Sequence, residues 1–567
     1  MNWWNVHHYS TGKPCRLSDW WLVVDHNVVL ASVKNLPINL ISEHIESKMN
    51  LIPLPAEAFA SLAARTWILI QGIYFAWIAA NVAGWLHHKL TKVKAPRVGK
   101  DPWISGLWRA RKHFVVNGKR LTQEAYARDR HSMYWVQTGD MERLVLPSIH
   151  IEELRKLPES HIDSRMAVVE RNLGWYNRVD IILKSTAHVD VCRTQLVQNL
   201  GRITAGQTST LDAVFRREMG ACYKDEDFHS FNAAETFLNI VNRSVANALV
   251  GEGLCDDDRW LQLCLDTTVN TGKLCRDLQP WPDLLRPIVC HFLNARRSLD
   301  RDFTASQEIL TEAIKSRKRG DGNVDILQWL IDRHDGTYDD AGLSFLTNQT
   351  LFIAIAATRS TASSIVNTLF DLVAHPEHQG TLRSEIRTAL AVHGSWCLEA
   401  VQEMKRLDSF IKESQRLHHH LLLSFNRKVK QPITLSSGTK IPAGTFISTP
   451  AYWAARDPSA FPPTGDGFEP WRWFDLREEA EQKGLSEIPF LASTPSPHNL
   501  HWGYGRNACP GRFMAAVEVK LIIAWILWNF DVSWPLGQTK RPENLFIDER
   551  VLPDPRQQIR FRRRTEI

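Results

Sequence analysis

A cysteine at the start of a long apolar run is the feature that most constrains this chain. Cys509 ends the segment Trp-Gly-Tyr-Gly-Arg-Asn-Ala-Cys, and Pro510 and Gly511 follow it. The glycines before the cysteine allow a tight loop, and Pro510 suits the first position of a helix, where its missing N–H is not needed. The thiol would then lie at a helix N-terminus, where backbone N–H groups and the helix dipole favour the thiolate. A thiolate held on such a loop is a metal ligand or a nucleophile.

Apolar residues recur with helical periodicity through most of the chain. The longest such segments are 341–375, which contains no proline, 399–417 and 510–530. Alternation typical of strands is confined to short pieces such as 429–435 and 445–449. The pattern predicts a fold that is mainly α with a minor β region.

The composition limits the class of protein. Of 567 residues, 44% are hydrophobic, as in ordinary globular domains. The formal net charge of +6 gives no support for nucleic-acid binding. The nine cysteines include no Cys-x-x-Cys pair, which argues against a zinc module or a dithiol centre. Their odd number and the absence of a secretory signal indicate reduced thiols in the cytosol.

An uncharged segment near the N-terminus predicts a membrane anchor. Residues 66–86 contain no charged side chain, and as a helix they are long enough to span the hydrocarbon core. Trp67 and Trp85 stand near the two ends, where indole rings favour the membrane interface. The alternative is a buried core helix, which Gln71 and Asn81 favour. The basic residues after the segment place the following domain in the cytosol, and they are Lys89, Lys92, Lys94, Arg97 and Lys100.

The cysteine segment resembles the haem-binding loop of the cytochrome P-450 family, whose pattern is Phe-x-x-Gly-x-Arg/His-x-Cys-x-Gly. Trp502 stands at the Phe position, Gly505 and Gly511 at the two glycines, and Cys509 at the cysteine that binds iron. Asn507 replaces the usual Arg or His. The resemblance implies haem b as cofactor, with the Cys509 thiolate as its axial ligand.

Two further motifs of the same family occur upstream in the expected order. Glu413 and Arg416 match the Glu-x-x-Arg helix, and residues 468–473 match the Phe-x-Pro-x-Arg turn that contains Arg472. On these three motifs the chain is identified as a member of the family. Its segments resemble those of filamentous-fungal microsomal members. The resemblance implies the cytochrome P-450 fold preceded by a single transmembrane helix. It also implies that Glu413, Arg416 and Arg472 form a buried ion network that shapes the cysteine loop.

The resemblance assigns further residues to the haem. Arg427 aligns with an arginine that pairs with a haem propionate, and a guanidinium fits a carboxylate bidentately. Asn507 would contact a propionate without supplying charge, and Arg193 is a third candidate. Trp502 belongs to the loop beneath the ring. The alternative for Arg427 is an ordinary surface arginine.

A segment within 341–375 resembles the family's oxygen-activating helix. Residues 356–361, Ala-Ala-Thr-Arg-Ser-Thr, match its Ala/Gly-Gly-x-Asp/Glu-Thr-Thr signature. Ser360 holds the usual Thr position beside Thr361, and these alcohols would relay protons to the reacting oxygen. Arg359 replaces an acid, and a cation with a pKa above about 12 cannot shuttle protons. Proton delivery therefore differs, or Arg359 points away. The alternative for Ser360 is a helix serine bonded to its own backbone.

The resemblance implies a membrane-anchored haem-thiolate monooxygenase that oxidises an apolar small molecule with O₂. Electrons would come from an NADPH-dependent flavoprotein reductase, because the chain has no dinucleotide-binding fingerprint of its own. A basic surface around Arg506 and Arg512 would dock that partner. The fungal style suggests terpenoid or polyketide secondary metabolism. The alternatives are an isomerase, dehydratase or desaturase with the same haem, and a non-enzymatic haem-binding protein.

The chain then divides into four parts. Residues 1–65 form an N-terminal extension of unknown role, either a lumenal tail or an error in the gene model. Residues 66–86 are the anchor, 87–100 a basic linker with a proline, and 101–567 the haem-thiolate catalytic domain. The implied location is the endoplasmic reticulum membrane, single-pass, with the catalytic domain cytosolic.

Overall fold

The computed structural model describes residues 71, 72, 75, 76, 79, 82 and 92–565, apart from 335 and 337. The chain divides into two compact units, residues 1–92 and 93–567. The predicted extension at 1–65 lies outside the described residues. Of the predicted anchor, only the six residues between 71 and 82 are described, and they are helical and exposed.

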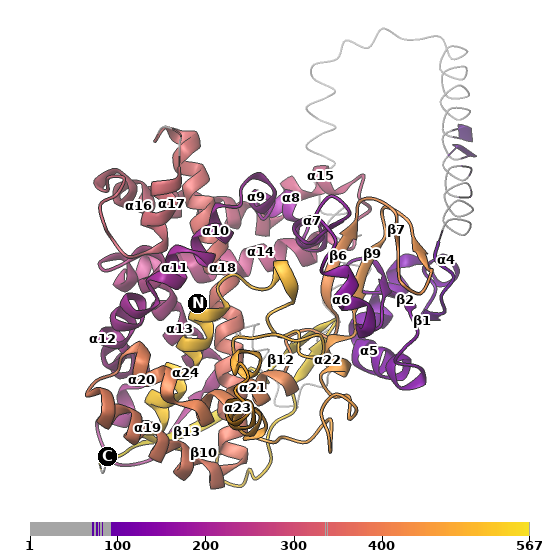
Figure 1. The fold of residues 1–567 in the computed structure, drawn as a ribbon. Coiled ribbons are helices and arrows are strands. Elements are labelled where there is room, and N and C mark those ends of the chain that lie inside the picture. The colour runs from indigo at the N-terminus through magenta and orange to yellow at the C-terminus, as the bar shows by residue number, and fades with distance from the viewer. Residues whose placement is uncertain are drawn as a thin grey trace, which may run out of the picture. The chain divides into compact units, whose positions relative to one another are not determined.

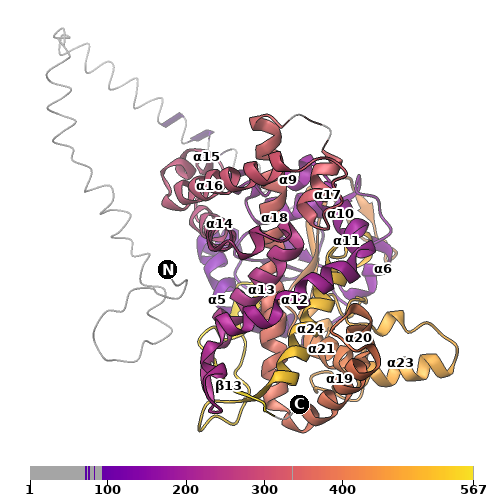
Figure 2. The ribbon, with the colours of Figure 1, turned by 90° about the vertical axis from the view of Figure 1, so that its left-hand side faces the viewer.

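The longest described helix, α18 (Asp340–Ala374), runs through the middle of the unit at residues 93–567 (Figures 1 and 2). It begins after Asp339, whose carboxylate accepts a hydrogen bond from the N–H of Gly342 at 2.9 Å. Among the described helices, α18 alone is long and apolar enough to cross a membrane, but more than half of its most apolar stretch is buried in the protein. The prediction of a helix at 341–375 is confirmed. Its main helical neighbours are α13 (Ala233–Val250), α14 (Asp258–Leu278), α16 (Asn294–Ser316), α21 (Lys405–Leu417) and α24 (Arg512–Asn529).

The helix predicted at 399–417 is interrupted. Met404 leaves the helical conformation, with ψ 70°, between α20 (Leu398–Glu403) and α21. The Glu385 carboxylate accepts two backbone N–H groups of the first turn of α21, at 2.7 and 2.9 Å, and so satisfies donors that have no partner within the helix. Glu385 belongs to a different helix, so periodicity alone could not reveal this start.

The largest sheet has six strands in the order β1-β2-β3-β9-β6-β4. It lies on the opposite side of the domain from most of the helices (Figure 1). Its strands are β1 (Arg97–Val98), β2 (Tyr134–Gln137), β3 (Glu142–Val145), β4 (Ile162–Asp163), β6 (Ser424–Val429) and β9 (Phe446–Thr449). The smaller sheets contain β10 (Phe530–Ser533), β13 (Gln558–Arg563) and β5 (His229–Asn232), then β11 (Leu545–Ile547) with β12 (Arg550–Leu552), and β7 (Ile433–Thr434) with β8 (Lys440–Ile441).

The strand predicted at 429–435 is wrong for most of its length. Strand β6 ends at Val429, and β7 covers only two residues of the predicted range. Pro432 has no N–H to donate to a ladder, and the N–H of Lys430 bonds to His161 O at 2.7 Å instead of to a sheet partner. The strand predicted at 445–449 matches β9 within one residue.

The remaining helices surround α18 and cover the sheet. They are α4 (Pro102–Ser105), α5 (Leu107–Arg128), α6 (Ile151–Leu154), α7 (Ser164–Arg171), α8 (Gly174–Asn177), α9 (Ile181–Lys184), α10 (Ala187–Arg193), α11 (Gln195–Gln198), α12 (Leu200–Glu218), α15 (Arg286–Val289), α17 (Ile326–Arg333), α19 (Gln379–His393), α22 (Ala451–Ala454) and α23 (Arg472–Gln482). The largest core cluster joins α12, α13, α18, α19, α21 and α24. The fold is therefore mainly α with a minor β region, as predicted.

Candidate active site

The loop before α24 has the tight geometry that its glycines predict. Gly503 and Gly505 have φ values of 71° and 72°, which side chains with a Cβ rarely adopt. A Cβ on Gly505 would also lie 2.9 Å from the Cβ of Arg155. The N–H of Cys509 donates to Trp502 O at 2.7 Å and closes the loop. Substitution of Gly505 would therefore disturb the segment that holds the cysteine.

Two opposing effects act on the Cys509 thiol. The backbone N–H groups of Gly511 and Arg512 face the sulfur and, with the Arg512 guanidinium, lower its pKa. Burial is the larger effect and raises the pKa above the ordinary value. The donors act in the predicted direction but do not outweigh burial in the loop alone, and a metal cation on the sulfur would deprotonate it outright. Helix α24 begins at Arg512, because Pro510 and Gly511 form a turn rather than its first residues.

A buried ion network holds the segments that precede the loop. Glu413 and Arg416 on α21 pair bidentately, at 2.6 and 2.9 Å, and both side chains are fully buried. Arg472, at the start of α23, lies 3.4 Å from Glu413 and 2.9 Å from Glu469. Trp473 donates its indole N–H to Glu413 at 3.0 Å. The structure thus brings together the three residues that the motifs indicated, with Trp473 as a fourth.

The guanidinium of Arg416 also organises backbone far from α21. It donates to the carbonyl oxygens of Ala455 at 2.6 Å and Gly467 at 2.8 Å. Arg472 donates to Pro462 O at 2.6 Å. These contacts add backbone hydrogen bonds to the ion pairs of Arg416 and Arg472, so the network joins α21 to backbone between residues 455 and 467.

Sequence reasoning missed three residues on the same helix. Lys412 is buried and donates to the carbonyls of residues 489, 491 and 494 at 2.8–3.1 Å. Ser409 accepts the N–H groups of residues 473 and 474 at 3.1 and 3.0 Å. Asp408 pairs with Lys520 of α24 at 2.7 Å and so ties α21 to the helix after the cysteine. The spacing of 408, 409, 412, 413 and 416 marks one helix face, which sequence alone would assign to solvent.

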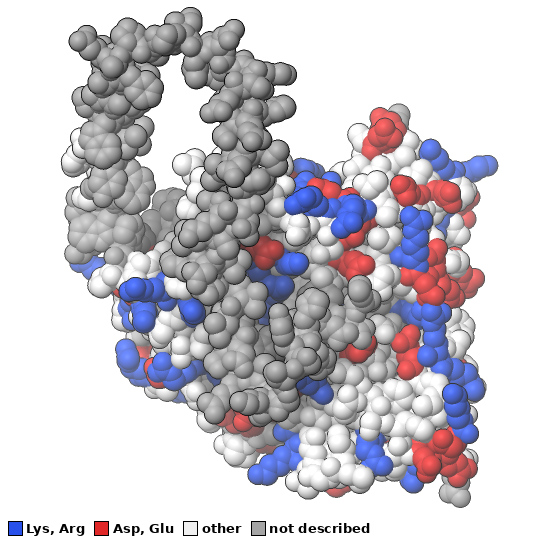
Figure 3. Space-filling model, turned by 180° about the vertical axis from the view of Figure 1, so that it is seen from behind, with Lys and Arg blue, Asp and Glu red and all other residues white. Residues whose placement is uncertain are grey.

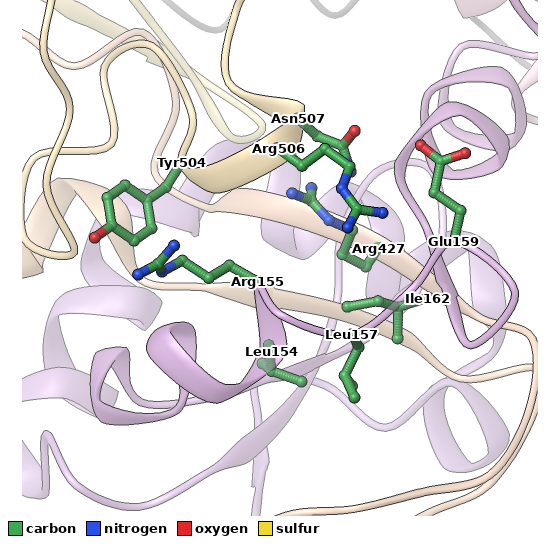
Figure 4. Close-up of a pocket in the computed structure, with 9 residues that line it drawn as sticks. All are labelled: Leu154, Arg155, Leu157, Glu159, Ile162, Arg427, Tyr504, Arg506 and Asn507. Atoms are coloured by element: carbon green, nitrogen blue, oxygen red, sulfur yellow. The ribbon is translucent and has the colours of Figure 1, made fainter.

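Not all of the residues expected to contact the haem carboxylates line the same pocket. Arg427 and Asn507 line one small pocket together with Arg506, Arg155 and Tyr504. Figure 4 shows Arg427, Arg506 and Asn507 grouped at one end of it, with Tyr504 and Arg155 at the other.

Two more predicted residues contact the loop from other sides. Arg193 is exposed on α10 and donates to the carbonyl of Arg506. Trp502 donates its indole N–H to Ala492 O at 2.7 Å. Both therefore position the cysteine loop through its backbone or its neighbours.

Arg427 is buried without a matching anion. Its side chain donates to the carbonyl of Asn426 at 2.8 Å and lies over the Phe425 ring, and it makes no ion pair with any described residue. Burial lowers the pKa of Arg427 to about 10. A buried guanidinium of this kind is costly unless an anion meets it. The surface-arginine alternative therefore does not describe Arg427, since the residue is only 6% exposed.

One turn of helix α18, at residues 356–360, has side chains that are exposed to solvent. Beyond its first two residues, Ala356, Arg359 and Ser360 are the exposed residues of the helix, and their spacing places them on one face. Ser360 Oγ bonds to Ala356 O at 3.1 Å, which is the back-bonded arrangement of the alternative interpretation. Thr361 points elsewhere and is buried. Ser360 and Thr361 therefore do not share a surface, although they are neighbours in sequence.

Comparison with known proteins decides the family. The profile of the family described as Cytochrome P-450 matches residues 119–561, most of the chain. The chain belongs to the cytochrome P-450 family. This P-450 is 33% identical to the cytochrome P-450 monooxygenase AN1598 of Emericella nidulans, over 83% of this chain and 88% of that protein. It is 30% identical to the ent-kaurene oxidase of Fusarium fujikuroi over 88% and 93%, and 31% identical to the monooxygenase paxP of Penicillium paxilli over 84% and 91%.

The fold agrees with this assignment. The structure of the retinoic acid-bound cyanobacterial P-450 CYP120A1 matches 84% of this chain and all of that chain, with a TM-score of 0.61 at 15% identity. The protein is thus an oxidoreductase, a P-450 monooxygenase that carries haem with a cysteine thiolate on iron and receives its electrons from a reductase.

The surface charge agrees with a small-molecule enzyme. On the face shown in Figure 3, basic and acidic side chains of the described residues are interspersed, with neither sign forming a broad field. That distribution matches the modest net charge of +6.

Proposed function

We propose that this P-450 hydroxylates or otherwise oxygenates an apolar small molecule of terpenoid or polyketide type in fungal secondary metabolism, with Cys509 as the iron ligand. The observation that carries the proposal is the sulfur of half-buried Cys509, which faces two backbone N–H groups in a loop next to the α21 network. Relatives named ent-kaurene oxidase and paxP monooxygenase support the substrate class.

The residues present fit a haem. A thiolate, a buried unmatched guanidinium and an amide suit a metalloporphyrin that carries two carboxylates. Arg427 and Asn507 would bind a propionate, whereas Trp502 and Arg193 would keep the loop in place. Bound haem supplies the chemistry that splits O₂, which a thiolate ligand favours.

The protein's own part in the reaction lies on the exposed turn of α18 at residues 356–360. The Ser360 hydroxyl is accessible there and can exchange its bond to Ala356 O for a bond to a water or to substrate. In that position it would hold a proton for the reacting oxygen. Thr361 is buried and would act only through packing or a buried water. Arg359, on the same turn, would set the charge that a substrate meets.

From the sequence and the relatives, we further propose a membrane anchor, domain boundaries and a redox partner for the enzyme. Residues 66–86 would anchor it in the endoplasmic reticulum membrane, behind the extension at 1–65, with 87–100 as linker and 101–567 as the cytosolic catalytic domain. An NADPH-dependent flavoprotein reductase would dock near Arg506 and Arg512. Arg512 donates to Cys509 O at 2.9 Å, so that surface adjoins the sulfur.

The test is to purify the protein with haem, reduce it and add carbon monoxide. Cys509→Ala should abolish the red-shifted Soret band of the reduced carbonyl complex and all turnover with reductase and NADPH. The matched control is Cys397→Ser, because Cys397 is a half-buried cysteine that caps α20 away from the loop. An unchanged band in Cys509→Ala would refute the ligand assignment. Expression with a reductase and comparison of metabolites with and without the protein would then identify the substrate.

A further inference from the structure

The turn that follows α18 brings two histidines and a glutamate together. The sequence there is His375-Pro376-Glu377-His378. His375 leaves the helical conformation, with ψ 63°, because a residue before proline disfavours the α region. Residues 376–378 then form a 3₁₀ turn, in which positions three apart lie on the same side. The imidazole nitrogens and the Glu377 carboxylate therefore lie close together, with one ligand atom of each residue within 4.8 Å of the other two.

The distances within this group are those of a metal site that is nearly closed. Glu377 Oε1 lies 3.4 Å from Nδ1 of His375 and 3.6 Å from Nε2 of His378. In a tetrahedral zinc site with bonds of about 2.0–2.2 Å, the ligand atoms are about 3.3 Å apart. Two of the three separations are thus near that value, and a small rotation of the imidazoles would bring the third to it.

Aromatic packing orients both imidazoles before any ion binds. The His375 ring stacks on Phe468, with centroids 4.9 Å apart and planes 14° apart. The His378 ring meets Trp471 edge to face, with centroids 5.2 Å apart. Side chains that are already held in place lose little conformational entropy when they bind a ligand. The two rings are therefore suited to bind an ion without a large rearrangement.

The charge around this group also suits a cation. The Glu377 side chain is 60% exposed, and its ion-pair contacts with described residues are the two imidazoles. Arg472, which follows Trp471 in sequence, is already paired with Glu413 and Glu469. Among the described residues, no lysine or arginine forms an ion pair with Glu377, so its negative charge is available to a metal.

We propose that His375, Glu377 and His378 bind a divalent transition-metal ion of the zinc class, with water in the remaining position. Imidazole nitrogens and a carboxylate are ligands of Zn²⁺, whereas Mg²⁺ and Ca²⁺ take oxygen ligands. Because the rings rest on Phe468 and Trp471, the ion would fasten the end of α18 to the segment that leads into α23. The site is independent of the haem and stabilises the fold.

The test is calorimetric titration of the haem-loaded protein with ZnCl₂, after a chelator has removed bound metal. The chain contains 22 histidines, so zinc binding is compared between variants and not counted in one protein. Glu377→Gln and His378→Gln should each remove one zinc equivalent or weaken it at least roughly tenfold, since even partners outside the ligand shell contribute that much to metal affinity. Mg²⁺ in roughly hundredfold excess should not compete.

The matched control is His393→Gln, which should bind zinc as the parent does. His393 lies 2.9 Å from the carboxylate of Glu403, and its side chain is 22% exposed, against 23% for His378. Zinc should also raise the midpoint of thermal unfolding of the parent but not of Glu377→Gln.

Two results would overturn the proposal. One is equal zinc binding by the parent, Glu377→Gln and His378→Gln, and the other is loss of the same zinc equivalent in His393→Gln. Glu377→Gln alters an exposed side chain and should keep the reduced carbonyl band, so a lost zinc site is distinguished from a misfolded protein. The same band shows that the proposed function stands whichever way the zinc titration falls.

Discussion

The buried face of α21 and the pocket lined by Arg427 differ in whether their charges have protein partners. On α21, Glu413 and Arg416 are fully buried, paired at 2.6 Å and bonded to backbone on several sides. In the pocket, Arg427 is buried and makes no ion pair with any described residue. Because Glu413 and Arg416 already have protein partners, this pair stabilises the fold and offers no free charge to a ligand. The pocket leaves positive charge available, which is what a binding site requires.

The largest expected loss of stability comes from a substitution in the buried ion network of α21. Glu413→Ala should cost about 3–5 kcal/mol of unfolding free energy, because it leaves buried Arg416 without its carboxylate. The variant should purify with little haem, and chemical denaturation with a measurement of haem content checks both points. The control Glu469→Ala removes a partner of Arg472 that is 37% exposed and should cost under about 1 kcal/mol. Equal losses in the two variants would contradict the distinction between buried and exposed pairs.

A buried acid without a cation should give an intermediate effect that depends on pH. Glu518 on α24 is buried, and burial raises its pKa to about 7. The unfolded chain releases this proton near pH 4.5 but the folded protein retains it until about pH 7, so stability falls as pH rises through that window. Glu518→Gln should remove a loss of up to about 3 kcal/mol between these pH values. Parallel pH profiles of unfolding free energy for the two proteins would contradict this expectation.

The smallest expected effect concerns the unmatched guanidinium of the haem pocket. Arg427→Gln should weaken haem retention by about 1.5–3 kcal/mol, because a charge-assisted bond to a carboxylate is lost. The haem-free protein should be no less stable than the parent, since the buried cation has no ion pair to lose among the described residues. Haem transfer to apomyoglobin and thermal unfolding of the haem-free form measure the two quantities. A haem-free variant that unfolds more easily would show that Arg427 is structural.

Much of the fold and of the candidate site could be predicted from the sequence. The features that could not be predicted all depend on contacts between segments that are distant in the chain. The range of α18 follows from periodicity, and Glu413, Arg416 and Arg472 follow from the resemblance to family motifs. The start of α21 depends on Glu385, which lies on another helix, and the burial of Arg427 depends on how distant elements pack. Lys412 and Ser409 gave no signal in the sequence, because their partners are backbone carbonyls and N–H groups that no side-chain pattern reveals.

The partners of α21 also bear on how the protein is made. Its buried polar side chains bond to backbone between residues 455 and 494 and to Lys520, all of which leave the ribosome after the helix itself. Because domains acquire structure as their segments emerge, this helix cannot settle until translation is nearly complete. A chain that ends before Lys520 would therefore leave buried polar groups of α21 without partners, and we expect it to be degraded and not to form a smaller enzyme.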